Sequence, residues 1–332
     1  MNTLAAHSIV AIHTLRAAIM NYARSQSPEI CEQYLLRLVS ILSDLRANGF
    51  GTAELEQRIN TALRNKDSGG YINHACELAA AGYFLQRFPD GFRYQVDSSV
   101  AAIGTGPAKN FDFSFVADER TFNVEVKAFA VKERLSGKCP PPKAFLTKAD
   151  REALYGLGMR FSKNCAPAIA RFLKDANTQL VQPEKGLSVV LLCCNDLDEY
   201  TDALTCFIGP HGICWQTEQE GLVPAPADLP NIDAVVICLL GFNHLAVVNP
   251  ARFKLFYNDE SAGIADGADA WNYVYAYPVG IYLRPGTQPI DPLDTFIKAF
   301  HSYNLNISEL MQQNGGDIQC AVFKLFNRAN NP

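Results

Sequence analysis

The sequence predicts an α/β protein with a helical N-terminal unit and a C-terminal α+β extension. Three segments carry this prediction. Residues 71–86 have helical composition, residues 110–127 alternate between polar and apolar side chains, and residues 187–194 form an apolar run bounded by turn residues. Alternation indicates a strand, and a short apolar run between turns is consistent with a buried central strand.

Residues 1–68 are expected to form the helical N-terminal unit. Residues 30–47 place apolar side chains on one helical face, and Gly49, Phe50 and Gly51 interrupt that pattern. The segment from Asp67 to Gly70 then joins this unit to the next region. We expect the N-terminal helices to contact a partner protein or a second copy in a homodimer, or simply to pack on the sheet.

Residues 71–86 predict a helix with a single ionised side chain, Glu77. Helical spacing puts Ala80, Ala81 and Phe84 on the same face as this glutamate. A carboxylate among apolar side chains costs free energy unless it is paired or faces a metal. Two interpretations remain open: Glu77 belongs to a functional site, or it lies at the rim of the apolar stripe and its tip reaches water.

A strand is expected near residues 92–96, and residues 110–127 predict an antiparallel hairpin with its turn at residues 117–120. If Val116 pairs with Thr121, Asp112 lies directly opposite Glu125. One face of this hairpin is then polar and the other is apolar enough to be buried. The polar face carries Asp112, Ser114, Asn123, Glu125 and Lys127, and the apolar face carries Phe111, Phe113, Phe115, Phe122, Val124 and Val126.

The two opposed carboxylates suggest a cation between them, because like charges directly opposite each other destabilise a strand pair. Oxygen ligands of this kind suit Mg²⁺, which binds one or two protein carboxylates and keeps waters and substrate phosphate oxygens. Lys127 projects from the same face, where it could orient or deprotonate a water and neutralise phosphate charge. The alternative is a half-exposed hairpin whose polar face carries charges by chance.

Residues 168–180 predict an amphipathic helix, which the apolar strand at residues 187–194 follows. The order is therefore a helix with Glu77, three strands of which the second carries Asp112 and the third Glu125-Val126-Lys127, a helix and a strand. This order resembles the PD-(D/E)xK nuclease superfamily, over about residues 69–195. Phe111 stands where the motif name of that family has proline.

The resemblance implies a restriction-endonuclease-like core at residues 69–250, with a mixed sheet flanked by helices. It implies that Glu77, Asp112, Glu125 and Lys127 form the active site. It also implies that the metal ligands are Glu77, Asp112, Glu125 and the carbonyl of Val126. Lys174 and Gln179 are candidates for nucleic-acid contact because the family often carries polar residues on that helix, although both fit a solvated helix face as well.

The remaining segments are placed only coarsely. Residues 232–249 predict two strands, residues 272–283 a further strand, residues 292–303 a helix and residues 319–326 a last strand. Residues 251–332 are expected to form the α+β extension and to pack on the core.

The charge distribution favours a nucleic-acid partner more than the net charge of −5 does. Residues 125–175 hold 11 Lys and Arg against 5 Asp and Glu, a local balance of +6 that leaves −11 elsewhere. This basic stretch begins at the candidate active site and includes Lys132 and Arg134, which are candidates for nucleic-acid contact. It suits a loop along a phosphate backbone or an ordinary solvated loop. No signal peptide or membrane-length apolar run is recognised, so we expect a cytoplasmic protein with no membrane partner.

These observations together predict a Mg²⁺-dependent nuclease, with Mn²⁺ as a substitute, that hydrolyses phosphodiester bonds of nucleic acid, DNA in the first place. Restriction, defence and repair are all compatible settings for such an endonuclease. A non-catalytic nucleic-acid-binding or protein-interaction module that retains the nuclease fold is the alternative. A structural module with an accidental motif is a third interpretation, which convergence of the four candidate side chains would argue against.

Overall fold

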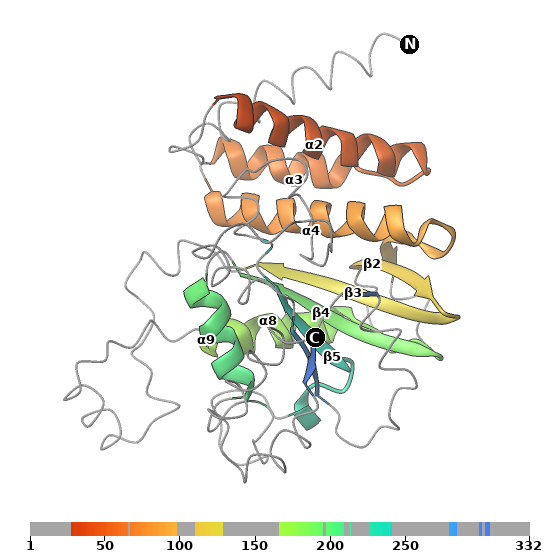
Figure 1. Cartoon of the computed structure of the whole chain (residues 1–332), viewed down its shortest axis with the longest axis vertical. Coiled ribbons are helices and arrows are strands. Elements are labelled where there is room, and N and C mark those ends of the chain that lie inside the picture. The colour runs from red at the N-terminus through yellow and green to blue at the C-terminus, as the bar shows by residue number, and fades with distance from the viewer. Residues whose placement is uncertain are drawn as a thin grey trace, which may run out of the picture.

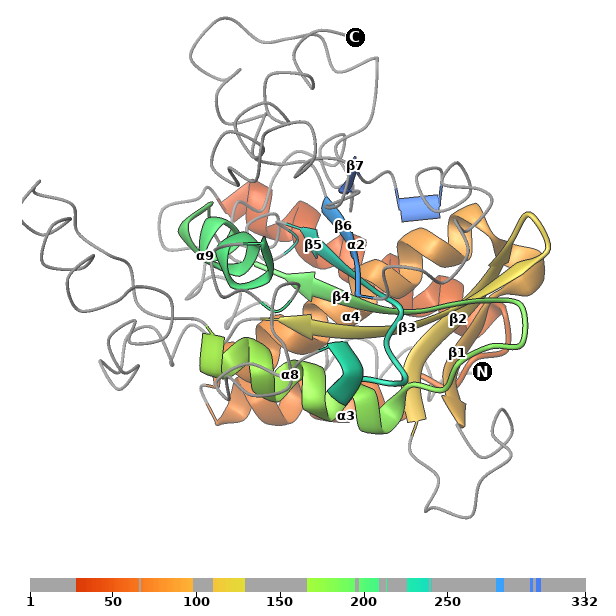
Figure 2. The ribbon, with the colours of Figure 1, turned by 90° about the horizontal axis from the view of Figure 1, so that it is seen from below.

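A mixed seven-stranded sheet with helices on both faces forms the centre of the protein (Figures 1 and 2). The structure is a computed structural model, and it describes residues 28–65, 67–97, 110–128, 166–194, 197–208, 213, 226–238, 240, 279–283, 299–300 and 303–305. The strands lie in chain order across the sheet, from β1 to β7. The predicted α/β class and the mixed sheet flanked by helices are therefore confirmed.

Three helices are stacked on one face of the sheet (Figure 1). They are α2 (Pro28–Ala47), α3 (Ala53–Arg64) and α4 (Ser68–Arg87). Both α2 and α3 pack on α4, which in turn covers β2 and β3. The helices predicted at residues 30–47 and 71–86 are thus α2 and α4, and α4 is the one that approaches the hairpin.

The antiparallel half of the sheet consists of β1 (Arg93–Asp97), β2 (Asn110–Ala117) and β3 (Arg120–Ala128). Val116 pairs with Thr121, as predicted. The turn itself is only Asp118 and Glu119, with φ of 47° and 59°. Two positive φ angles are typical of a type I′ turn, whose twist matches that of the flanking strands. Because neither residue is glycine, the turn costs about 1–2 kcal/mol per residue.

The parallel half of the sheet continues from β3 through two helical crossovers. Helix α8 (Ala166–Gln179) leads to β4 (Gly186–Cys193), and α9 (Leu197–Ile208) precedes β5 (Ala234–Cys238). β4 is parallel to β3 and to β5. Two short strands, β6 (Val279–Tyr282) and β7 (Tyr303–Leu305), extend the sheet beyond β5. Two 3₁₀ turns complete the described elements, η1 (Pro89–Gly91) and η3 (Pro226–Asp228).

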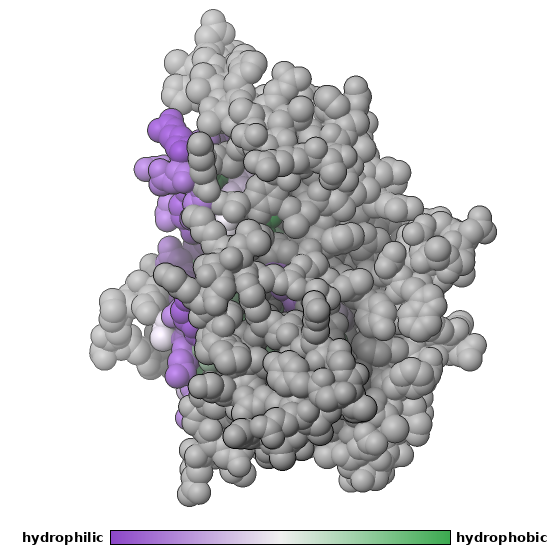
Figure 3. All heavy atoms as spheres, turned by 90° about the vertical axis from the view of Figure 1, so that its left-hand side faces the viewer, coloured by the Kyte–Doolittle hydropathy of each residue, from purple (hydrophilic) through white to green (hydrophobic). Residues whose placement is uncertain are grey.

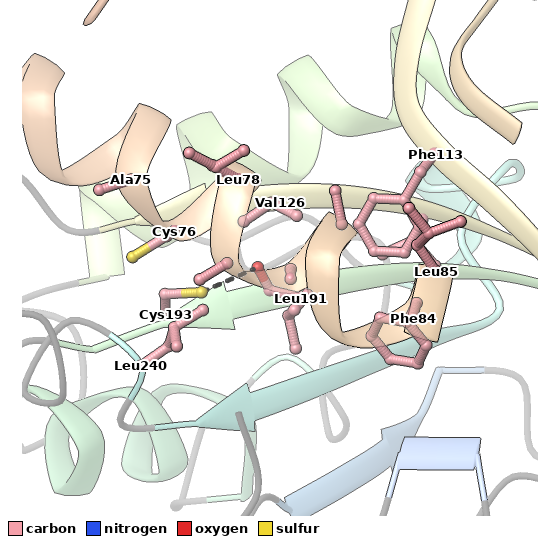
Figure 4. Packing of buried hydrophobic residues seen from close by; sticks show 14 of the residues in the cluster. Ala75, Cys76, Leu78, Phe84, Leu85, Phe113, Val126, Leu191, Cys193 and Leu240 are labelled. Carbon is pink, nitrogen blue, oxygen red and sulfur yellow. Dashed lines mark hydrogen bonds between the residues drawn. The ribbon is translucent and has the colours of Figure 1, made fainter. Parts of the chain in front are cut away.

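Two apolar clusters bury the two faces of the sheet. The first joins α2, α3 and α4 to β2 and β3, with the Phe84 and Phe115 rings stacked 4.5 Å apart. Figure 4 shows α4 side chains of this cluster against Phe113, Val126 and Leu191. The second joins α8 and α9 to the other face. Alternate residues of β4 enter the two clusters, so this strand is buried on both sides, as its continuous apolar run predicts.

The side-chain alternation of the hairpin is not fully regular. Phe111 packs in the second cluster, whereas Phe113 and Phe115 pack in the first, so the expectation that all three share a face is wrong. The irregularity coincides with Gln95, which has a φ of 50° in β1 between the pairs Tyr94–Phe113 and Val96–Phe111. Gln95 therefore stands level with Asp112, where the local backbone departs from a regular pleat.

Several predicted elements lie wholly or partly outside the described residues. The strand expected at residues 272–283 is described only as β6, and the one at residues 319–326 not at all. Tyr303, expected at the end of a helix, begins β7. The three predicted domains at residues 1–68, 69–250 and 251–332 stay predictions, although α2, α3 and α4 share one apolar cluster and β6 and β7 belong to the central sheet.

The described helices include no segment long and apolar enough to cross a membrane. On the face drawn in Figure 3, the described residues that reach the surface are mainly hydrophilic.

β4 lies so close to β3 at Gly186 that this position requires a glycine. An added Cβ would lie 1.8 Å from the carbonyl oxygen of Thr121, and the φ of 150° is one that other residues rarely adopt. We expect Gly186→Ala to lower the free energy of unfolding by on the order of 3 kcal/mol in urea denaturation. Gly51→Ala is the control, since a Cβ there would meet nothing within 4 Å. Equal stability of the two variants would show that the close approach of β4 and β3 at Gly186 is wrong.

Candidate active site

Asp112 and Glu125 lie on the neighbouring strands β2 and β3, and each side chain contacts the backbone of the other strand. The backbone N–H of Val126 donates to Asp112 Oδ2 over 2.7 Å, and the backbone N–H of Asp112 donates to Glu125 Oε2 over 3.3 Å. The register Phe113–Val124 leads to this arrangement, since one further step along the ladder puts Asp112 opposite Glu125. The two carboxylates therefore meet between the strands, as the hairpin predicts.

Lys127 lies beside the carboxylates of Asp112 and Glu125. Its Nζ lies 2.6 Å from Glu125 Oε1 and also donates to Gln179 Oε1, at 3.1 Å, from the end of α8. Gln179 Nε2 in turn donates to the backbone carbonyl of Asn110 over 3.4 Å. Gln179, predicted as a nucleic-acid contact, therefore lies beside the candidate lysine and links α8 to β2 and β3.

Glu77 of α4 is 1% exposed, so the interpretation that places its tip in water is wrong. The Tyr94 hydroxyl donates to Glu77 Oε1 over 2.7 Å. On the other side, Arg58 Nη1 and His74 Nδ1 lie 3.9 Å and 3.6 Å from Glu77 Oε2. Burying a carboxylate costs free energy because it loses its hydrogen bonds to water. The hydroxyl of Tyr94 and the nitrogens of Arg58 and His74 offset part of this cost for Glu77.

A contact beside Glu77 ties α4 to β3. Asn73 Oδ1 accepts a hydrogen bond of 3.1 Å from the backbone N–H of Ala128, the last residue of β3. This bond holds the first turns of α4 over the end of the strand that carries Glu125 and Lys127. Glu77 is one helical turn further along α4, and its charge acts on both Asp112 and Glu125.

The carboxylates of the site are electrostatically frustrated. Burial raises the pKa of Asp112 well above its ordinary value, and the charges of Glu125 and Glu77 raise it further. Burial also raises the pKa of Glu125, although Lys127 opposes this shift. For Lys127, burial lowers the pKa, but attraction to Glu125 and Asp112 outweighs it, so the net shift is upward. The arrangement thus favours a positive charge, and a proton or a metal ion can supply it.

The polar face of the hairpin is mostly enclosed, and its alternative interpretation as a half-exposed face is wrong. Ser114, Asn123 and Glu125 are buried, and Asn123 Nδ2 donates to the Val181 carbonyl beyond α8. Asp112 and the Lys127 side chain retain partial exposure, with 16% of the latter accessible. The site is therefore less enclosed at Asp112 and Lys127 than at Glu125 and Glu77.

The other predicted nucleic-acid contacts are not brought together with these residues. Lys174 is exposed on α8, five residues before Gln179, so the two side chains point in different directions from the helix. Lys132 and Arg134 lie outside the described residues.

Tyr94, Arg58 and His74 are site residues that the sequence pattern did not reveal. Tyr94 lies within the strand expected at residues 92–96. Tyrosine is common in strands as a packing residue, so its sequence position does not indicate that its hydroxyl binds Glu77. Arg58 comes from α3, which is remote from Glu77 in the chain. His74 is three residues before Glu77 on the same helix, and this spacing is a signal in the sequence that could have indicated a partner for the glutamate.

Among the described residues, no group of three or more His, Cys, Asp or Glu side chains is arranged to hold a metal ion. The three carboxylates expected as metal ligands, Glu77, Asp112 and Glu125, are therefore not brought together as one ligand group. Magnesium needs fewer protein ligands, since it commonly uses one or two carboxylates and completes its shell with waters and phosphate oxygens. The pair Asp112 and Glu125 suits such an ion by its chemistry.

Comparisons with protein-family models, with curated proteins and with solved structures find no match for this chain.

We expect Asp112→Asn to stabilise the metal-free protein as the pH rises. A raised folded-state pKa means that Asp112 contributes stability at acid pH, which is lost as the pH rises from the ordinary value of 3.8 through the folded-state value. Asparagine avoids this loss and still accepts from Val126 N–H. Urea unfolding in EDTA should show no difference near pH 4 and a gain on the order of 1 kcal/mol at pH 8.

The control for this experiment is Asp90→Asn, since Asp90 is exposed in η1. It should unfold like the wild type at both pH values. If Asp112→Asn is less stable than the wild type at pH 8, then the charge of Asp112 is not destabilised by burial and by the neighbouring carboxylates.

Tyr94→Phe should destabilise the protein by about 1.5–3 kcal/mol, because the hydroxyl is a buried donor to a charged group. Tyr83→Phe is the matched control. The Tyr83 hydroxyl makes an exposed hydrogen bond of 3.3 Å with Arg87, so its loss should change the free energy of unfolding by less than about 0.5 kcal/mol. If both variants unfold alike, Tyr94 does not support Glu77 as described.

Proposed function

We propose that the protein is a Mg²⁺-dependent nuclease that hydrolyses phosphodiester bonds, with DNA as its first candidate substrate. The observation that carries the proposal is the meeting of Asp112, Glu125 and Lys127 at one partly accessible point of the β2–β3 hairpin. Two acceptor side chains next to a cationic donor suit a metal ion and the phosphate that it binds.

The order of elements supports the same proposal. Helix α4, strands β1, β2 and β3, helix α8 and strand β4 follow one another in the order that the PD-(D/E)xK resemblance implies. β3 is antiparallel to β2 and parallel to β4. Glu77, Asp112, Glu125 and Lys127 lie on the elements where that family carries its acidic residues and its lysine. The restriction-endonuclease-like core is the finer fold assignment that we propose.

Asp112 and Glu125, with the Val126 carbonyl, would hold Mg²⁺ or its substitute Mn²⁺. Glu77 would support the same site, since its charge already raises the pKa of both carboxylates. When bound, the ion would polarise the phosphate and lower the pKa of a coordinated water. Oxygen ligands are those that Mg²⁺ and Mn²⁺ prefer.

Lys127 would act as a cation rather than as a base. Its pKa is raised by Glu125 and Asp112, so Nζ stays protonated at neutral pH and can donate to a phosphate oxygen or orient the attacking water. Gln179 would position Lys127, because its amide oxygen accepts from Nζ. Asp112, at the accessible side of the site, would be the carboxylate closest to the incoming phosphate.

Cleavage assays test this proposal. The wild type should cut at least one of four substrates (supercoiled DNA, linear duplex DNA, single-stranded DNA or RNA) with Mg²⁺ or Mn²⁺ and none with EDTA. Asp112→Asn and Lys127→Ala should each lower the rate by at least about 100-fold, because each removes a group that acts on the reacting phosphate. Lys185→Ala, an exposed lysine paired with Glu119, is the control that should cut normally.

The rival interpretation is a non-catalytic nucleic-acid-binding or protein-interaction module with the same fold. Binding of these substrates without cleavage under any metal condition would favour that module. Cleavage that persists in both Asp112→Asn and Lys127→Ala would mean that the activity comes from elsewhere.

A further inference from the structure

Gln95 of β1 lies directly across the strand pair from Asp112. In the register of β1 and β2, Phe111 and Phe113 pair with the residues on either side of Gln95. Directly opposed residues of an antiparallel pair have Cα atoms about 4.5–5.5 Å apart. Gln95 is therefore a close neighbour of the carboxylate that, in the proposed function, meets the incoming phosphate.

The backbone of Gln95 is unusual for a strand. Its φ is 50°, a value that residues with long side chains rarely adopt. Among the described residues other than glycine, Asp118 and Glu119 also have positive φ, but they form the two-residue turn between β2 and β3. Conformations of this kind persist only where the surrounding structure imposes them, and they are common at active sites and ligand clamps.

The side chain of Gln95 has a buried amide nitrogen, Nε2, without a hydrogen-bond partner in the described structure. Two nearby carboxylates of the site accept from other donors. Asp112 Oδ2 accepts from the backbone N–H of Val126, and Glu125 Oε1 accepts from Lys127. Because buried donors are almost always paired with protein, water or a ligand, the amide requires an acceptor from outside the chain.

Gln95 differs in this respect from the other buried nitrogens without hydrogen bonds in the described part of the chain, Arg58 Nε and His74 Nδ1. Arg58 Nε lies 3.7 Å from Glu54 Oε1. His74 Nδ1 lies 3.6 Å from Glu77 Oε2. Both therefore face a carboxylate of the protein, whereas the amide of Gln95 carries no charge that a neighbouring carboxylate could offset.

We propose that Gln95 is a further residue of the candidate active site, and that its amide N–H donates to a non-bridging oxygen of the phosphate held at Asp112. The inference rests on the proposed nuclease function for its substrate. A neutral donor suits this position, since it stabilises negative charge on the phosphate without a cation that would compete with the metal for the carboxylates. The alternative acceptor is an ordered structural water.

Gln95→Met tests this role, because methionine has a side chain of similar length but lacks the donor. Cleavage with Mg²⁺ should slow at least about tenfold. The urea midpoint should equal or exceed that of the wild type, because an unpaired buried donor has been removed. Gln57→Met is the matched control, since Gln57 is exposed on α3, and it should resemble the wild type in both measurements.

Inorganic phosphate is a probe that needs no cleavage. In the presence of Mg²⁺, phosphate should raise the unfolding temperature of the wild type and of Gln57→Met, because a ligand that binds only the folded state stabilises it. The increase should be smaller for Gln95→Met, which lacks one donor to the anion.

Cleavage by Gln95→Met at the wild-type rate would overturn the inference and leave the nuclease intact, since the amide would then bind only a structural water. A lower urea midpoint for Gln95→Met would also overturn it, because the amide would then stabilise the protein without a ligand. If the wild type cuts no substrate, the nuclease is contradicted and the phosphate experiment decides about Gln95. A smaller effect of phosphate on Gln95→Met would still support an anion site there, and an equal effect would overturn it.

Discussion

The register of the β2–β3 hairpin is the constraint on which the rest of the site depends. A turn of only two residues fixes the pairing of Val116 with Thr121, and this pairing carries Asp112 to the level of Glu125. A slip of one residue would turn the polar side chains of one strand to the face opposite those of the other strand. The phenylalanines that stack under α4 oppose such a slip, because burying each of them stabilises the fold by about 1.5–3 kcal/mol. Packing of the apolar face thus positions the charges of the polar one.

Burial of the carboxylates of Glu77, Asp112 and Glu125 is the second feature that determines what the site can bind. Three carboxylates act on one another within the described site, while Lys127, Tyr94 and Arg58 offset only part of their repulsion. Such an arrangement destabilises the protein unless a cation or a ligand joins it. An excess of negative charge suits a bound cation, and a divalent metal ion would meet this requirement.

Periodicity predicted the local elements well, because hydrophobic patterning acts over a few residues. Helices α2, α4 and α8, the hairpin and the buried strand β4 all lie where the sequence places them, with no end shifted by more than three residues. Contacts between distant segments were not predictable. The bond from Tyr94 to Glu77 joins residues 17 positions apart in the chain, and the reversal at Phe111 coincides with the positive φ of Gln95. Helix α9 was also missed, although Leu197, Tyr200, Leu204 and Phe207 recur at helical spacing.

A crystal structure of the protein soaked with Mn²⁺ would test the central claim most directly, since the anomalous signal of manganese locates the ion independently of activity. We expect one peak bound to Asp112 and Glu125 oxygens, at the roughly 2.0–2.3 Å typical of a hard divalent cation, with Lys127 Nζ displaced from Glu125. Manganese only at other surface sites, with Lys127 still paired to Glu125, would contradict the claim that these carboxylates form a metal site.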